Sequence, residues 1–167
     1  MIEKLKVLDR VKYTFRTKYR GGHRIHSPYV YNLVREIFMK RRNAVSPSDA
    51  ELTVALCQTG LKYDYSYRVG QFLKYNHFHF YSMNPTEYNG EELLVVTTIP
   101  DPAQFDRMVR QMRAEHQRSA VVCVSIYRNK ECRNWWKMQH ELQLDLYRIG
   151  ILIYDGNLNK EYFKLKI

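Results

Sequence analysis

The chain of 167 residues lacks any apolar run as long as the roughly 20 residues that a membrane-spanning helix needs. Its N-terminus carries a charge every few positions and so lacks the uninterrupted apolar segment of a secretory signal. It has only three cysteines, an odd number, and each lies in a segment of apolar pattern. This favours reduced thiols over a disulfide framework. We therefore expect a cytoplasmic protein without a membrane partner.

Acidic residues are scarce in the first quarter of the chain. Residues 1–43 hold 12 Lys and Arg against 3 Asp and Glu, whereas residues 44–167 hold 15 against 14. Aromatic residues interleave the basic ones, and such a segment can follow phosphates and stack on bases. A basic amphipathic helix with its charges in water explains the same pattern. RNA is thus one candidate partner, and the candidate binding surface consists of Arg20, His23, Arg24, His26, Arg41 and Arg42.

Helical signals fill the first 75 residues. Ser27-Pro28 and Ser46-Pro47 each combine a capping serine with a proline suited to the first helical turn. Apolar residues then recur at helical spacing. The pattern predicts helices from residue 28 to about residue 40, from 47 to 58 and from 63 to 75. We expect residues 1–75 to form a basic helical N-terminal region.

The second part of the chain has the periodicity of strands. Residues 77–83, from His77 to Met83, begin with strict alternation, and two later runs are rich in β-branched apolar residues. Helical patterns follow both of these runs, which predicts strand-helix-strand units. The expected strands are 77–83, 93–99, 120–126, 142–154 with Gly150 as a kink or bulge, and 162–167. We expect one domain over 1–167, with an α/β core at 76–167.

Both ends of the chain resemble a bacterial family of class I S-adenosylmethionine-dependent methyltransferases. Residues 22–31 read GHRIHSPYVY, similar to the family's GxHGxHSPFV-type segment. Residues 144–154 read LDLYRIGILIY and residues 160–165 read KEYFKL, similar to the family's closing strands. The two matches cover about a quarter of the chain, and the middle agrees only in its pattern of elements.

The resemblance implies a Rossmann-like sheet of seven strands, of which this chain has five. Only residues 84–92 separate the expected first strand from the run at 93–99, too few for a crossover that contains a helix. We therefore expect the family's second and third strands to be deleted. This leaves a reduced methyltransferase core of about five strands in the order 1-4-5-7-6, with the last pair antiparallel.

The same deletion removes the family's cofactor chemistry. No glycine follows the expected first strand until Gly90, and the strand that carries the ribose-binding acid is missing. Thr97–Thr98 and Ser125–Ile126 stand where the family has carboxylates. We expect a non-catalytic binding or scaffold module, a pseudoenzyme with no cofactor, no metal and no catalytic residues. The alternatives are nucleic-acid binding through the N-terminal region and a methyltransferase with a rebuilt or partner-completed site.

Two places are candidates for contacts. Deletion leaves the strand from His77 to Met83 at a sheet edge, which must be covered by the N-terminal helices or pair with a second copy. We favour a homodimer through this edge strand. The carboxyl ends of the parallel strands form the other candidate, a groove near residues 83–87, 97–101 and 125–129. His77 and His79 have zinc-ligand spacing, but no further ligand lies nearby in sequence, which favours an exposed strand face.

Overall fold

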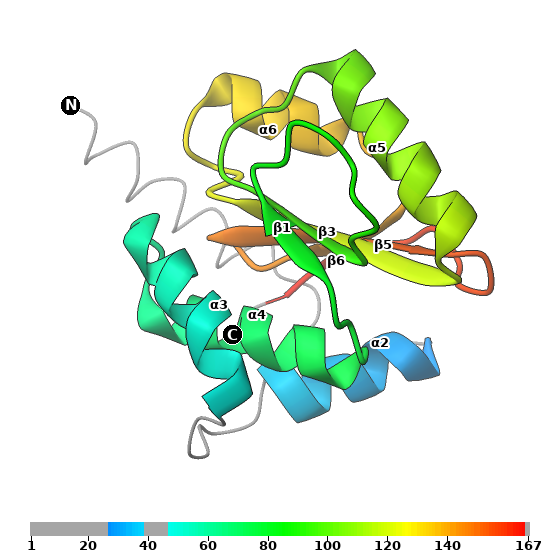
Figure 1. Ribbon diagram of the computed structural model, residues 1–167. Helices are drawn as coiled ribbons and strands as arrows, with labels where there is room; N and C mark the ends of the chain where they lie inside the picture. Colours follow the sequence, from blue (N-terminus) through cyan, green and yellow to red (C-terminus); the bar gives the residue numbers. More distant parts are fainter. Residues whose placement is uncertain (1–26, 39–46, 166–167) are drawn as a thin grey trace.

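The computed structural model describes residues 27–38 and 47–165 of the chain (Figure 1). The described part is mixed α/β, with a six-stranded sheet and helices on both of its faces. The helices are α2 (Pro28–Leu33), the π-helix η1 (Val34–Phe38), α3 (Pro47–Gln58), α4 (Tyr63–Tyr75), α5 (Pro102–Glu115) and α6 (Lys130–Lys137). The strands are β1 (Tyr81–Met83), β2 (Leu93–Val96), β3 (Arg118–Val124), β4 (Leu142–Asp145), β5 (Ile149–Asp155) and β6 (Tyr162–Lys164).

Local sequence signals fix most of the helix ends. The Ser27 hydroxyl accepts from the Val30 N–H at the start of α2, and the Asp101 carboxylate accepts from the Gln104 N–H at the start of α5. The expected bounds of α3 and α4 are confirmed. The first predicted helix instead changes from α to π geometry at Val34. One Arg68 nitrogen donates to the carbonyl oxygens of Ile37 and Phe38 at the end of η1.

The sheet order is β1-β2-β3-β5-β4-β6. β1, β2 and β3 are parallel neighbours, β5 is antiparallel to both β3 and β4, and β6 is parallel to β4. None of residues 84–92, which connect β1 to β2, is helical. This agrees with the expectation that the connection is too short for a crossover helix.

The predicted strand count and order are wrong at the C-terminal end. The segment 142–154 is not one strand with a bulge but two antiparallel strands, β4 and β5, joined by a tight turn. In that turn the Leu146 N–H donates to the Ile149 carbonyl at 3.0 Å, and Tyr147 has a φ of 68°. β5 therefore lies beside β3, where the last strand was expected. β6 is instead an edge strand parallel to β4, so the last pair is not antiparallel.

The first strand is shorter than predicted. Residues 77–80 are not strand, because His77 has a φ of 56° and the N–H groups of His77 and Phe78 close the end of α4. The N–H groups of His79 and Phe80 donate to the Glu92 carboxylate at 2.5 and 3.2 Å. These bonds replace the strand pairing that was predicted from the alternating residue pattern alone. His77 and His79 are both exposed, as expected of an exposed face.

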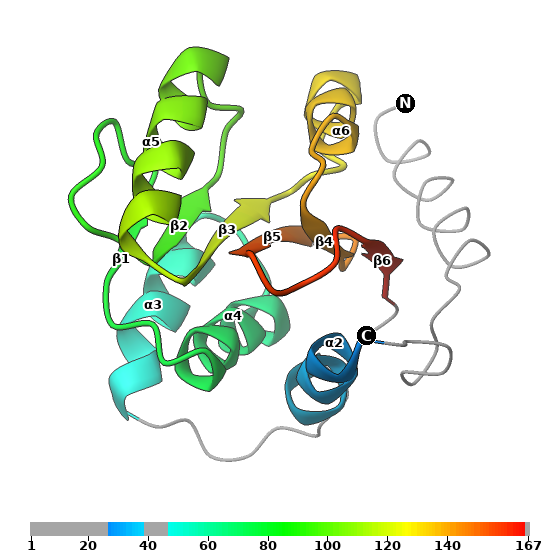
Figure 2. The same cartoon turned by 90° about the vertical axis from the view of Figure 1, so that its right-hand side faces the viewer.

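Two apolar layers hold the sheet between the helices (Figure 2). One face packs against α2, η1, α3 and α4, with Leu33, Phe38, Leu56 and Phe72 among its fully buried side chains. The other face packs against α5 and α6. Burial of this apolar surface on both faces is the main favourable free energy of the fold. No helix among the described residues is long and apolar enough to span a membrane.

The second layer contains a close contact between β5 and α6. Trp136 is 1% exposed, and its ring leaves no room for a side chain at Gly150, where an added Cβ would lie 2.6 Å from ring carbons. Trp135 is only half-buried and meets Phe105 edge-on at 5.4 Å. Adjacent residues of a helix point in different directions, so the two tryptophans cannot both enter the core. Cys123 is buried, whereas Cys57 and Cys132 are half-buried, and all three are free thiols.

Candidate functional site

A cavity of about 500 Å³ opens where β2 and β3 end. We call it the carboxyl-end groove; its lining residues are Thr59, Thr97, Thr98, Val124, Ser125, Tyr127, Arg128, Tyr147 and Arg148. They come from the end of α3, from the loops that follow β2 and β3, and from the turn between β4 and β5. Crevices outside the carboxyl ends of parallel strands are the usual ligand sites of α/β sheets.

The parallel strands bring two of the three predicted segments to this groove. Thr97 follows β2 and Ser125 follows β3, so their register places both at the same end of the sheet. The third segment supplies Asn84, next to the groove. Its side-chain oxygen accepts from the Thr97 N–H at 2.8 Å and from the Thr97 hydroxyl at 2.9 Å. A cavity therefore lies at two of the three segments where the sequence predicts a groove, 97–101 and 125–129.

The turn between β4 and β5 is held by the carboxylate of Asp145, which is fully buried. The Tyr127 hydroxyl donates to its Oδ2 at 2.6 Å, and the Tyr162 hydroxyl donates to the same oxygen at 2.5 Å. The Tyr147 N–H donates to its Oδ1 at 3.0 Å. A buried carboxylate needs such donors to replace its lost hydration. Asp145 thus ties the groove wall to the edge strand β6.

Three residues in or beside the groove have a positive φ. Ser125 and Tyr147 line it with φ of 60° and 68°, and Asn84 beside it has a φ of 49°. Residues other than glycine rarely adopt this left-handed backbone region. Backbone strain of this kind clusters at functional sites. The Ser125 N–H donates to the Arg148 carbonyl at 2.6 Å, which joins the loop after β3 to the β4–β5 turn. Two separate loops are therefore locked together at the mouth of the groove.

Two stacked tyrosines form one wall of the groove. The rings of Tyr127 and Tyr147 lie 5.6 Å apart at an interplanar angle of 23°. Arg148 lies over the Tyr147 ring at 5.8 Å, and the Lys164 ammonium lies over the Tyr127 ring at 5.5 Å. Burial, together with the negative charge of Asp145, raises the pKa of Tyr127 far above its usual range. Its hydroxyl therefore stays protonated as a donor at neutral pH.

The described residues that line the groove supply hydrogen-bond donors and cations. Among the described residues that line it there is no Asp, Glu, His or Cys. Ser125 has no neighbouring base, and the nearby Asp145 is buried behind the tyrosines with its oxygens engaged. Clusters of three or more potential metal ligands are likewise absent from the part of the chain that the structure describes. The arrangement can bind and orient a ligand.

The residues at the end of β1 do not suit S-adenosylmethionine. The strand leads into Asn84 and Pro85, and no glycine lies between β1 and Gly90, so the end of β1 lacks a glycine turn of the kind that lets a backbone approach a cofactor closely. The Asn84 side chain instead fills this position and bonds Thr97. No step of a methyl transfer can be derived from these residues.

The predicted binding surface cannot be compared with this groove. Arg20, His23, Arg24, His26, Arg41 and Arg42 all lie outside the described residues. Sequence reasoning missed Tyr147 and Arg148, because the segment around them was interpreted as the middle of a strand. A polar Asp-Leu-Tyr-Arg stretch between two apolar runs was the available signal for a turn.

Comparisons of the chain with protein-family models, with curated proteins and with solved structures gave no match. The methyltransferase relationship therefore stays a prediction that rests on the sequence resemblance.

Proposed function

We propose that this protein is a non-catalytic, methyltransferase-like binding module whose ligand site is the carboxyl-end groove. The observation that carries the proposal is the lining itself: hydroxyl groups, two arginines and a stacked tyrosine pair, without a carboxylate, imidazole or thiol. Three parallel strands followed by an antiparallel one support a Rossmann-like core. Three free cysteines support a reducing compartment such as the cytoplasm.

A titration with S-adenosylmethionine and S-adenosylhomocysteine tests the loss of the cofactor site. We expect no heat of binding by calorimetry up to millimolar ligand, because no glycine turn follows β1 and the strand that would carry the ribose-binding acid is missing. Binding at micromolar strength would overturn the proposal in favour of a rebuilt cofactor site. The Asn84→Gly variant is the informative control, since it removes the side chain that bonds Thr97 and opens the end of β1.

The scaffold part of the proposal concerns the edge strand β1. Within the described part of the chain, its only neighbour in the sheet is β2. The Phe80 carbonyl accepts from the Leu93 N–H at 3.2 Å, and the Asn84 N–H donates to the Val95 carbonyl at 2.7 Å, so both residues face β2. Backbone groups alternate along a strand. The N–H and C=O groups of Tyr81 and Met83 therefore point away from β2, toward the free edge.

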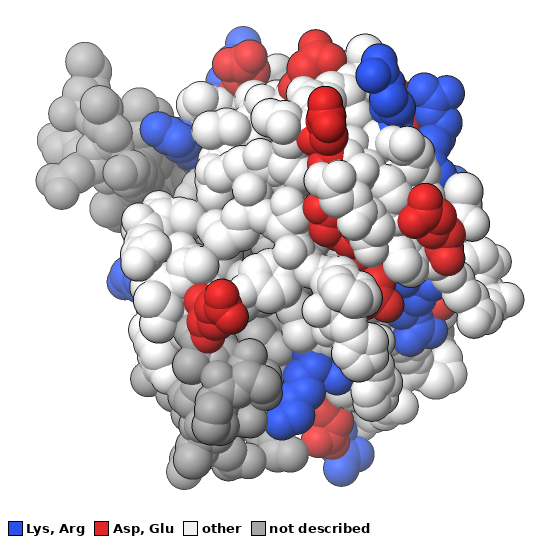
Figure 3. All heavy atoms as spheres, in the orientation of Figure 1, with Lys and Arg blue, Asp and Glu red and all other residues white. Residues whose placement is uncertain are grey.

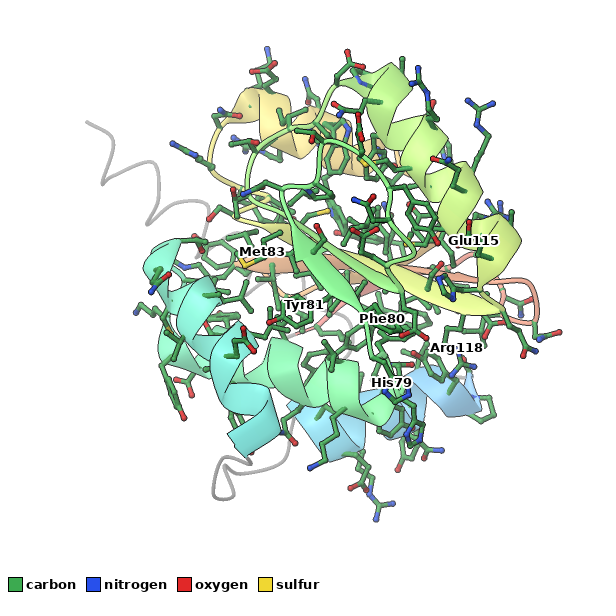
Figure 4. All side chains as sticks on the ribbon, in the orientation of Figure 1. His79, Phe80, Tyr81, Met83, Glu115 and Arg118 are labelled. Atoms are coloured by element: carbon green, nitrogen blue, oxygen red, sulfur yellow. The ribbon has the colours of Figure 1, made fainter. Side chains whose placement is uncertain are left out.

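This edge lacks the charges that usually discourage pairing. Residues 77–86 contain no Lys, Arg, Asp or Glu, and Phe80 next to the strand is 67% exposed. β1 is the strand nearest the viewer in Figure 1, and uncharged atoms cover most of the centre of the same side in Figure 3. Figure 4 places His79 and Phe80 on the segment that leads into β1. Uncharged edges of this kind favour strand addition.

The edge is complementary to itself about a twofold axis at Ser82. Antiparallel pairing there places Tyr81 opposite the partner copy's Met83 and the reverse, so all four outward N–H and C=O groups of each strand are bonded. On the face of the sheet that packs against α2, η1, α3 and α4, Tyr81 then meets the methionine sulfur of the partner copy, a favourable aromatic contact. The Glu92 carboxylate already occupies the N–H groups of His79 and Phe80, which limits pairing to this short register.

Sedimentation over a wide concentration range tests this homodimer. The Ser82→Lys variant places two like charges against each other at the twofold axis, and we expect dimerisation to weaken at least about tenfold. The control is Gln111→Lys, which adds the same charge on the exposed side of α5 and leaves dimerisation unchanged. A wild-type protein that stays monomeric at every concentration would overturn the scaffold part alone.

A further inference from the structure

Two guanidinium groups lie at the same groove without an acidic partner. Arg128 follows β3 and Arg148 lies in the β4–β5 turn, and both are exposed. Among the described residues neither makes an ion pair, and the arginines that do pair, such as Arg113 and Arg118, lie outside the groove. Two like charges that line one groove without a counter-ion repel, and an anion bound in the groove removes this cost.

Hydroxyl donors complete the polar lining. Thr98 and Ser125 line the groove, and within the described part of the chain their hydroxyls have no hydrogen-bond partner. Together with the two guanidinium forks they offer more donors than the two oxygens of a carboxylate can accept. A phosphate monoester has three terminal oxygens and nearly two negative charges at neutral pH. The charge and the donor count therefore favour phosphate.

Backbone hydrogen bonds fix the two loops that carry the arginines before a ligand arrives. The Ser125 N–H bonds the Arg148 carbonyl at 2.6 Å, and the Arg128 N–H bonds the Ser125 carbonyl at 2.8 Å, so one serine joins both cationic loops. Arg148 also rests on the Tyr147 ring, which stacks on Tyr127. Prior ordering of this kind lowers the entropic cost of binding.

We propose that the carboxyl-end groove binds the phosphate group of a small phosphorylated molecule between Arg128 and Arg148, with Ser125 and Thr98 as further donors. This inference rests on the proposed function, because it names the ligand class of the same groove. The cavity of about 500 Å³ has room for the rest of a nucleotide or sugar phosphate. The Tyr147 ring already contacts both the Tyr127 ring and the Arg148 guanidinium, so recognition centres on the phosphate rather than on base stacking.

Calorimetric titration of the full chain with AMP, ribose phosphate, inorganic phosphate and adenosine tests the ligand class. We expect AMP and ribose phosphate to bind, adenosine to give no heat, and affinity to fall as salt is raised. Equal affinity for AMP and ribose phosphate identifies the sugar phosphate as sufficient, and tighter binding of AMP identifies a nucleotide. Binding of adenosine as tight as that of AMP, or no binding of any phosphate, would overturn the inference.

Matched variants locate the site. Arg128→Gln and Arg148→Gln should each weaken AMP binding at least about tenfold, whereas Arg107→Gln removes the same charge from the exposed side of α5 and leaves it unchanged. Equal affinity in all three variants overturns the arginine assignment. Thr98→Trp fills the exposed mouth of the groove without a change of charge, and AMP binding that survives it contradicts the groove as the site. Micromolar binding of S-adenosylmethionine would instead refute the proposed function, while silence toward both ligand types refutes the phosphate assignment only.

Discussion

The β4–β5 turn and the β1 edge lie in one sheet and differ in how fully their polar groups are satisfied. In the turn, the buried carboxylate of Asp145 accepts bonds from two hydroxyls and one N–H, and Gly150 lies directly against Trp136. At the edge, the outward backbone groups of β1 have no strand partner among the described residues, and Phe80 is 67% exposed. Contacts within the chain fix the conformation of the turn, which suits a rigid ligand site. The edge, in contrast, has backbone groups that can bond a partner.

Removal of the buried carboxylate should have the largest effect on stability. We expect Asp145→Ala to lower the free energy of unfolding by about 3–4 kcal/mol, because it leaves two hydroxyls and one N–H without their acceptor. Urea unfolding followed by circular dichroism measures this loss. Asp106→Ala, on the exposed side of α5, is the control and should stay within about 0.5 kcal/mol of wild type. Equal stability of the two variants would show that the turn does not depend on Asp145.

The contact between β5 and α6 should give the next largest effect. Gly150→Ala puts a Cβ 2.6 Å from the ring carbons of Trp136, which is too buried to move away. We expect a loss of about 2 kcal/mol, the usual scale of overpacking. Gly156→Ala makes the matching change where nothing lies within 4 Å, and should be close to neutral. A neutral Gly150→Ala would mean that α6 does not sit against β5 as described.

Loss of one hydroxyl from the turn should cost less and should depend on pH. Tyr127→Phe removes a bond to a buried carboxylate, and we expect a loss of about 1.5 kcal/mol at pH 7. Burial and Asp145 raise the pKa of Tyr127 in the folded state. Its contribution is therefore complete below about pH 10, the value for an unfolded tyrosine, and is lost as pH rises above it.

Urea unfolding of wild type and Tyr127→Phe at several pH values between neutral and strongly alkaline tests the sign. The difference between the two proteins should shrink at the alkaline end. Tyr31→Phe, which removes a hydroxyl from an exposed ring on α2, is the control at pH 7 and should stay within about 0.5 kcal/mol of wild type. A stability difference between wild type and Tyr127→Phe that widens with pH would contradict the assignment of Tyr127 as a protonated donor.

The same contrast explains which parts of the fold could be predicted from sequence. Local signals were sufficient for α4, where apolar spacing alone gave both ends, and for α5, where Asp101-Pro102 marks the start. The groove position also followed from sequence, because parallel strands bring Thr97 and Ser125 to one end of the sheet. In each case the determining interaction lies within a few residues or within a regular register.

The parts that were missed depend on contacts between distant residues. The segment 142–154 is apolar enough to be one strand, and it turns because the carboxylate of Asp145 is held by Tyr127 and Tyr162, both 17 or more residues away. Likewise β1 begins late because Glu92 takes the N–H groups before it. Periodicity does not reveal side-chain to backbone or side-chain to side-chain bonds of this range.

The smallest effect on stability should come from the edge, where it separates folding from assembly. Phe80→Ser removes a ring that is 67% exposed, so the free energy of unfolding should change by less than about 0.5 kcal/mol. If the edge pairs with a second copy, the same variant should weaken dimerisation several-fold in sedimentation experiments. Val54→Ser, which removes another exposed apolar side chain from α3, should alter neither quantity. Dimerisation that is unaffected by Phe80→Ser and by Ser82→Lys would place the dimer contact elsewhere. β1 would then be a short strand that does not pair with a second copy.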